Sequence, residues 1–322
     1  ICCLVSTSIG TSTGTISMAV PIFLPLTTII NCNPALILGA IVCGSFFGDN
    51  LSPISDTTII SINTMKVELY ETLKQRAKIS LICFGLSCIV YIILGYYFIP
   101  NNTIVLEYNY SLSPLVMMLT FIIMAILLIK KKDIISVLLV CDMAAIVIAV
   151  LFGFINIEEL LCSNSCIVTG IEGVFGVIIF WIFLFILTGF IPEETLENIA
   201  NKNLKSEKKS NFLGIAIIIL SVLMVANNTA AMSLISKFIN KCFKNKTQIE
   251  KANIFDGLSC AVPGLLPYNT AFMLMISMAY DTGCISQNFS VFLILLFSVN
   301  SIFLLIFYII LALRKSKTYK IS

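Results

Sequence analysis

Carboxylates in apolar surroundings are the residues of this sequence best placed to do chemistry. Asp49 and Asp56 stand seven residues apart in one apolar stretch. Asp142 and Glu172 lie in two other stretches, and Asp256 lies near the end of a further one. An acidic side chain inside a hydrocarbon layer costs about 2.5 kcal/mol or more and usually has a function. We expect no Lys or Arg inside these stretches, so each carboxylate there must take up a proton or bind a metal cation.

Oxygen ligands cluster around Asp49 and Asp56, where residues 48–53 interrupt an apolar helix. Carboxylate, amide and hydroxyl oxygens together suit a small hard cation such as Na⁺. A structural alternative is helix capping, with Ser52 as the N-cap and Pro53 as the first helical residue. Two aspartates are more than a cap needs, so we favour a cation site. The uncharged candidate ligands in this segment are Asn50, Ser52, Ser55, Thr57 and Thr58.

Polar residues also interrupt three other apolar stretches, at 6–15, 227–229 and 263–270. We interpret the first two as hairpin tips and the third as a second break in a helix. Tips of this kind bind ions or substrates in transporters with inverted repeats. The alternative for the first tract is that small residues merely allow close helix packing. The candidate ligands are Thr11, Thr13, Thr15, Asn227, Asn228, Thr229, Asn269 and Thr270.

The elements that must position these residues are transmembrane helices. The 322-residue chain is 58% hydrophobic and 11% charged, with a mean hydropathy of +1.02, and soluble proteins carry about twice that share of charged residues. Apolar runs long enough to cross a bilayer recur, so we predict an all-α polytopic membrane protein. The sequence has no histidine, which excludes imidazole metal sites and histidine proton relays. The predicted uninterrupted spans are 79–99, 112–129, 134–155, 166–190 and 289–313.

The distribution of positive charge predicts the topology, because cytoplasmic loops retain Lys and Arg. All 20 fall in 66–78, 130–132, 192–210, 237–251 and the end of the chain. Two consecutive basic segments therefore flank the single apolar stretch 211–236, which is too short for two crossings of about 20 residues each. We predict a re-entrant hairpin that turns at Asn227.

The sequence also contains a weak internal repeat. Sliding the chain along itself until Pro53 falls on Pro267 places Thr15 on Thr229 without a gap. The charge pattern gives the two matched broken helices opposite directions, which predicts inverted repeats. Residues 1–99 would be the C-terminal part of the first repeat and 112–322 the second, within one transmembrane domain. By this symmetry we expect about 100 further residues before Ile1.

Segment 48–58 resembles the GD-x-x-SP-x-SDTT signature of NhaC-type Na⁺/H⁺ antiporters, in the ion transporter superfamily. The resemblance implies a multi-pass protein of the plasma (inner) membrane that exchanges Na⁺ for H⁺, with Asp49 and Asp56 as the carriers. It implies no cofactor beyond the transported ions. Further segments similar to that family are 6–15, 170–174, 256–260 and 264–268.

Three alternatives remain at this stage. The first is the exchange of organic acids such as malate and lactate, which related transporters carry out. The expected lack of intramembrane Arg or Lys argues against an anion site. An inactive truncated fragment is the second. An intramembrane hydrolase is the third. The sequence argues against it, because we find no histidine, no Ser/Lys dyad in a span and no paired GxGD aspartates. The expected partners are Na⁺, H⁺ and the lipid bilayer, and nucleic acid is not indicated. A homo-oligomer is compatible with the sequence.

Overall fold

The computed structural model describes residues 1–98, 134–156, 207–285 and 289–314, with a few single positions between 116 and 186. Contacts divide the chain into two compact units, one made of 1–101 with 179–322 and the other of 102–178. The described secondary structure is helical, as predicted. Among the described residues, the broken helices and hairpins belong to the first unit, so the account below concerns mainly that unit.

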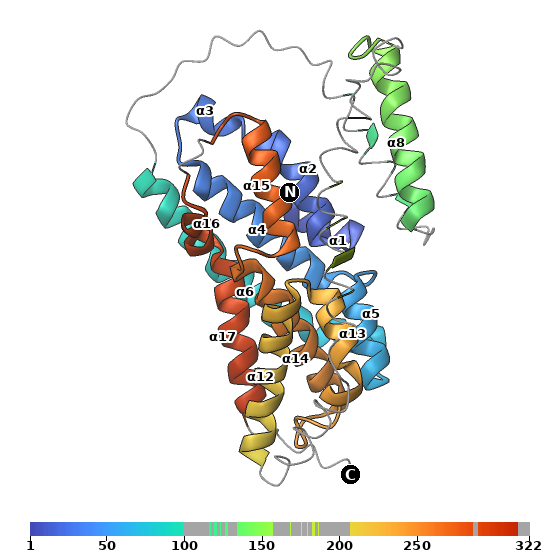
Figure 1. Cartoon of the computed structure of the whole chain (residues 1–322), viewed down its shortest axis with the longest axis vertical. Helices are drawn as coiled ribbons and strands as arrows, with labels where there is room; N and C mark the ends of the chain where they lie inside the picture. The colour runs from blue at the N-terminus through green and yellow to red at the C-terminus, as the bar shows by residue number, and fades with distance from the viewer. Residues whose placement is uncertain are drawn as a thin grey trace. The chain divides into compact units, whose positions relative to one another are not determined.

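The N-terminal part of the first unit is a hairpin followed by a broken helix and a long helix (Figure 1). Asn33 caps the helix that starts at Pro34, a residue suited to a first helical turn. The same helix then ends at Leu51, and a turn at Pro53 and Ile54 separates it from the next helix, which starts at Asp56. The elements are α1 (Cys2–Ile9), α2 (Ser12–Phe23), α3 (Leu26–Ile30), α4 (Pro34–Leu51), α5 (Asp56–Met65) and α6 (Leu69–Phe98).

The C-terminal part repeats this order of elements. A capping box formed by Thr247 and Glu250 starts its broken helix, which is interrupted between Ala261 and Thr270. The elements are α12 (Glu207–Val225), α13 (Asn228–Ile239), α14 (Gln248–Ala261), the 3₁₀ turn η2 (Pro263–Leu265), α15 (Thr270–Asp281), α16 (Val291–Phe297) and α17 (Val299–Leu313). The second unit contains α8 (Ile134–Leu151), which matches the predicted span 134–155.

The two hairpin tips have the same backbone conformation. Gly10 (φ 77°) and Ala226 (φ 54°) are both left-handed, and each precedes an extended residue that caps the next helix. Those caps are Thr11 (φ −146°, ψ 128°) and Asn227 (φ −144°, ψ 127°), so the two tips have matching conformations. The predicted alignment, in which Thr15 falls on Thr229, pairs Thr11 with Val225 and so differs by two positions from the match in conformation.

The broken helices α4 and α14 form the centre of the first unit. Helices α1 and α2 pack on α4, while α12 and α13 pack on α14. The half-helices after the breaks pack against the other half of the molecule, because α5 contacts α13 and α14 and α15 contacts α2. These crossed contacts bring the two hairpins and both helix breaks together within the first unit. The N-terminal and C-terminal parts that supply them are far apart in the sequence.

Three stretches of the described residues are long and apolar enough to cross a membrane: Pro34–Met65, Leu69–Phe98 and Gln248–Asp281. The pair α16 and α17 becomes a fourth if it is counted as one bent span. These lengths and compositions agree with an integral membrane protein.

The prediction of one uninterrupted helix over 289–313 is wrong, because α16 and α17 meet at Ser298 with a bend of 56°. The interruption is stabilised from α6: the Tyr91 hydroxyl donates a hydrogen bond of 2.6 Å to the carbonyl oxygen of Phe297. The predicted span 79–99 is also too short, because α6 already begins at Leu69. The predicted spans 112–129 and 166–190 lie largely outside the described residues.

Candidate functional site

The hairpin tips and the break between α4 and α5 meet around a polar cavity of about 60 Å³. A volume of this size is taken by a few water molecules or by one ion with part of its hydration shell. Eight of the candidate ligands predicted from the sequence line it, together with Gly10 and Ser12. The lining residues are Gly10, Thr11, Ser12, Thr13, Asp49, Ser55, Asp56, Asn227, Asn228 and Thr229.

Asp49 is the buried carboxylate of this cavity, with 4% of its surface exposed. It lies in the last turn of α4, where the helix dipole disfavours a negative charge, so its position does not stabilise the helix. The Ser55 hydroxyl donates a hydrogen bond of 2.6 Å to Asp49 Oδ1. Ser12, from the first hairpin tip, also interacts with the Asp49 carboxyl group. Asp49 therefore joins one hairpin tip to the α4–α5 break.

Asp56 lines the same cavity but is exposed. It is the first residue of α5, where a negative charge interacts favourably with the helix dipole. The capping alternative for Ser52 and Pro53 is wrong, because Ser52 ends α4 and α5 begins three residues after Pro53. Ser55 occupies the N-cap position, yet its hydroxyl bonds to Asp49 and not to an amide of α5. Capping thus explains Asp56 better than it explains Asp49 or Ser55.

The two hairpin tips contribute matching residues to the cavity. Thr11 caps α2 by accepting from the Gly14 amide, and Asn227 caps α13 by accepting from the Ala230 amide at 2.8 Å. Two residues after each cap stands a threonine, Thr13 in the first tip and Thr229 in the second, and both line the cavity. The backbone carbonyl of each threonine accepts a hydrogen bond of 2.9 Å from a serine four residues later.

Other candidate ligands do not line this cavity but form hydrogen bonds in the segments around it. The Ser52 hydroxyl donates to the carbonyl oxygen of Thr7 at 2.8 Å, and Thr57 lies 2.9 Å from the Ser55 hydroxyl. Thr15 bonds back to the Thr11 carbonyl oxygen at 3.0 Å. Asn269, at the second break, caps α15, and Thr270 follows it as the first helical residue.

The expectation that no Lys or Arg lies inside the apolar helices is wrong. Arg76 is fully buried in α6 and forms an ion pair of 2.8 Å with Asp256 of α14. Asn50 and Thr58, two predicted cation ligands, bond to this arginine: Arg76 Nη1 donates to the Asn50 carbonyl oxygen at 3.0 Å and to Thr58 Oγ1 at 2.8 Å. They therefore belong to a buried charged network and not to the cavity.

The burial of Arg76 is not evident from the sequence, because this arginine belongs to the basic segment 66–78, which has the charge pattern of a cytoplasmic loop. A usable signal was the spacing of Asn253 and Asp256, which places both on one face of α14. Both bind the guanidinium group, since Arg76 Nε donates to Asn253 Oδ1 at 3.0 Å. Two polar residues on one face of a helix that belongs to a membrane-spanning stretch, here Gln248–Asp281, indicate a buried polar partner.

The secondary candidates are not placed at this cavity. Asp142 lies in α8, in the other compact unit, and its side chain is exposed. Glu172 lies outside the described residues.

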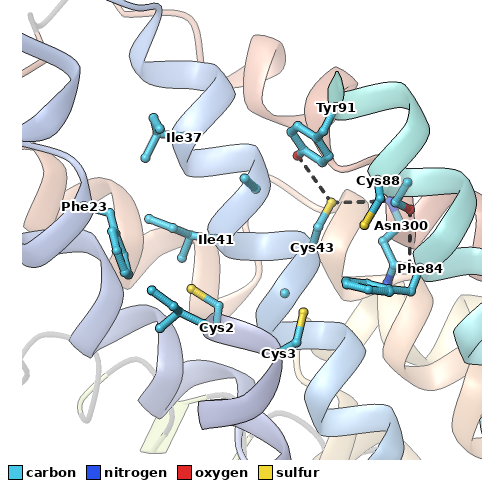
Figure 2. A pocket seen from close by; sticks show the side chains of 14 residues that line it. Cys2, Cys3, Phe23, Ile37, Ile41, Cys43, Phe84, Cys88, Tyr91 and Asn300 are labelled. Atoms are coloured by element: carbon cyan, nitrogen blue, oxygen red, sulfur yellow. Dashed lines mark hydrogen bonds between the residues drawn. The ribbon is translucent and has the colours of Figure 1, made fainter. Parts of the chain in front are cut away.

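A second, larger cavity of about 310 Å³ is almost entirely apolar and contains none of the predicted ligands. Figure 2 shows four cysteines around it, and Cys43 lies between Tyr91 and Asn300. The Tyr91 hydroxyl is 3.5 Å from Cys43 Sγ, and the amide of Asn300 donates to that sulfur at 3.3 Å. Within the described residues no disulfide joins these thiols. The four cysteines are Cys2, Cys3, Cys43 and Cys88.

Comparison with known proteins agrees with the resemblance found in the sequence. Residues 1–98 match the model of the Na⁺/H⁺ antiporter family. An uncharacterized Na⁺/H⁺ antiporter of Haemophilus influenzae is 34% identical over 173 residues, which are 50% of this chain and 36% of that protein. The malate-2H⁺/Na⁺-lactate antiporter of Bacillus subtilis is 24% identical over 171 residues, or 51% of this chain and 36% of that protein.

The Na⁺/H⁺ antiporter NhaC of Alkalihalophilus pseudofirmus is 30% identical over 95 residues, or 30% of this chain and 21% of that protein. The chain thus matches about a third of the length of the first two relatives and about a fifth of this one. No solved structure matches it. The resemblance to NhaC-type antiporters is confirmed.

Proposed function

We propose that this chain is part of a secondary antiporter that exchanges Na⁺ for H⁺ across the plasma membrane by alternating access. Na⁺ and H⁺ compete for Asp49 in the cavity between the two hairpin tips, and this competition couples their movements. The observation that carries the proposal is the convergence of one buried carboxylate, three tip threonines and two tip asparagines on one small cavity. The ligands are all oxygen donors of the kind that Na⁺ prefers.

Inverted repeats give the proposal its conformational mechanism. The two tips share one backbone conformation, and the N-caps at the two breaks, Ser55 and Asn269, coincide in the alignment that places Pro53 on Pro267. Secondary transporters with inverted repeats bind their ions where the repeats meet and alternate by moving one part against another. The cavity lies at such a meeting point, since Thr13 and Thr229 reach it from equivalent positions.

The geometry favours a cation over an organic acid. Although Arg76 is buried, all three of its guanidinium nitrogens bond to protein groups, and it does not line the polar cavity. The carboxylates that do line the cavity, Asp49 and Asp56, would repel an anion. The malate/lactate exchange named for one relative is therefore the weaker alternative for this chain.

The test is a Na⁺-triggered pH change in proteoliposomes that contain the full-length protein, measured from pH 6 to 9. Asp49→Asn keeps the size of the side chain and one ligand oxygen but removes the charge, so we expect proton movement to be lost with expression intact. Asp56→Asn should also lose activity if Asp56 carries ions. If Asp56 only stabilises α5, Asn should cost a few tenths of a kcal/mol and leave transport near normal.

Glu68→Gln is the matched control, because it removes an exposed carboxylate that does not line the cavity. It should transport as the unaltered protein does. Full activity of Asp49→Asn would contradict the assignment of Asp49 as the carrier.

A further inference from the structure

The buried arginine network adjoins the end of α4, since Arg76 bonds to Asn50 and the preceding residue, Asp49, lines the cavity. Arg76 contacts three other elements: the end of α4 through the Asn50 carbonyl oxygen, α5 through Thr58, and α14 through Asn253 and Asp256. An unpaired charge in such a place would cost several kcal/mol, so the ion pair with Asp256 is a condition for burying the guanidinium group.

Asp256 is fully buried as well, and its two oxygens differ. Oδ2 accepts from Arg76 and also from the Asn50 side-chain amide at 2.8 Å, whereas Oδ1 has no hydrogen-bond partner among the described residues. Asn50 is fixed in turn by the Ser80 hydroxyl, which donates to its side-chain oxygen at 2.6 Å. Asp256 is therefore already neutralised by a fixed cation and has no need of a transported one.

A chain of small polar groups joins Asp256 to the cavity. Cys260 Sγ lies 4.0 Å from Asp256 Oδ2 and 3.6 Å from Thr57 Oγ1, and Thr57 lies 2.9 Å from Ser55, which bonds to Asp49. Hydroxyl and thiol groups screen charge far less than bulk water does. A net charge created at the arginine network would therefore act strongly on Asp49.

We infer that Arg76 acts on the cation site through its charge: by neutralising Asp256, it leaves Asp49 as the one uncompensated buried carboxylate among the described residues that line the cavity. This inference rests on the proposed function. Among the described residues of the cavity and the arginine network, the buried charged groups are Asp49, Asp256 and Arg76. Their charges sum to −1 when both carboxylates are ionised. One monovalent cation or one proton at Asp49 brings this network to neutrality.

The test compares the apparent KM and kcat for Na⁺ in three variants of the full-length protein. At alkaline pH, where protons do not compete with Na⁺ for Asp49, Asp256→Asn leaves the positive charge of Arg76 unbalanced. This should raise the KM for Na⁺ about ten- to hundredfold, the range expected for a unit charge near a carboxylate. The double variant Arg76→Gln with Asp256→Asn removes both charges, so its KM should return to within about threefold of the original value. Arg76→Lys keeps the charge and should behave like this double variant.

Lys78→Gln is the matched control, because it removes an exposed cation from the same helix and should leave KM unchanged. Size-exclusion chromatography in detergent identifies variants that fail to fold. Asp256→Asn is preferred to Arg76→Gln as the single variant. It creates a charge imbalance while the guanidinium group keeps its bonds to Asn50 and Asn253. A KM in Asp256→Asn equal to that of the unaltered protein would overturn the inference. So would a double variant as impaired as Asp256→Asn.

Direct binding of ²²Na⁺ to the purified proteins separates this inference from the proposed function. If the unaltered protein binds Na⁺ but moves no protons, the proposed exchange fails, while the order of affinities among the variants still decides the role of Arg76. If the unaltered protein does not bind Na⁺ at all, both are overturned.

Discussion

The side-chain amide of Asn269 donates a hydrogen bond of 2.7 Å to the backbone carbonyl oxygen of Ala226. Asn269 thus connects the second helix break to the second hairpin tip, at the left-handed residue that turns the chain. The first half makes a comparable connection from Ser52 to the Thr7 carbonyl oxygen. Each hairpin is therefore tied to the break of its own half, and a movement of one should carry the other with it.

Asn269→Ala should separate the second tip from its break. The substitution removes the cap of α15, worth about 0.5–2 kcal/mol. It also removes one hydrogen bond to the buried Ala226 carbonyl oxygen, worth about 0.5–1.5 kcal/mol, while the Thr270 amide still donates to that oxygen at 3.4 Å. We expect a lower unfolding temperature in detergent and weaker Na⁺ binding. Asn63→Ala, an exposed position in α5, is the control and should change neither. An unaltered affinity in Asn269→Ala would show that the connection does not shape the cavity.

Asn227→Asp should change the pH dependence of transport while keeping the side-chain cap of α13. Aspartate caps a helix as well as asparagine does, so α13 should keep its stability. The added negative charge lines the same cavity as Asp49, where carboxylate repulsion favours protonation. The pH at which Na⁺ uptake is half-maximal should therefore rise.

Asn227→Ser, which caps the helix without a charge, should leave that pH where it is. The measurement is the initial rate of ²²Na⁺ uptake between pH 6 and 9. Identical profiles for the aspartate and serine variants would contradict the placement of this tip beside the carrier.

Gly48→Ala should disturb the packing of the first hairpin against α4. A Cβ atom at this position would lie 2.6 Å from the carbonyl oxygen of Cys3 and 2.6 Å from the amide of Thr7, and it would also meet the side chain of Ser6. Such overpacking costs about 1–3 kcal/mol, so the unfolding temperature should fall. Gly85→Ala is the matched control, because a Cβ there meets nothing within 4 Å, and it should not destabilise the protein.

The segments 192–210 and 237–251 should lie on the same, cytoplasmic side of the membrane. In a cysteine-free background, a reagent applied from outside should miss cysteines placed at Lys205 and Lys244. A cysteine at Thr282, in a segment without Lys or Arg, should react as the positive control. Reaction at Lys244 but not at Lys205 would replace the re-entrant hairpin by a simple span.

The sequence predicts the polar cavity better than it predicts the charged network. Asp49, Thr13 and Asn227 were found because polar residues in apolar runs must be satisfied, and a hairpin tip or a broken helix is where that happens. Arg76 could not be found from charge counting, because a buried arginine and a loop arginine look alike when both stand beside lysines. Its burial depends on Asp256, a contact between distant parts of the chain.

Local signals also failed where tertiary contacts decide the backbone. Ser298 looks like any serine in an apolar helix, and the break there depends on Tyr91 in α6, which accommodates the exposed carbonyl group of Phe297. Ser52 and Pro53 carry a strong signal for a helix start, yet Ser52 serves the first hairpin and the helix starts later. In each case a partner remote in sequence overrides the local preference.

The pairing of α6 with α14 also constrains how the protein is made. Asn50 and Asp256, which meet at the guanidinium group, are 206 residues apart, so the ribosome delivers α6 to the membrane long before α14 is available. Until then Arg76 has no counter-charge, and its place near the start of α6 allows its long side chain to reach the lipid headgroups. Burial of the arginine is consequently a late step of biogenesis. A nascent chain halted before residue 256 would therefore hold this arginine without its counter-charge.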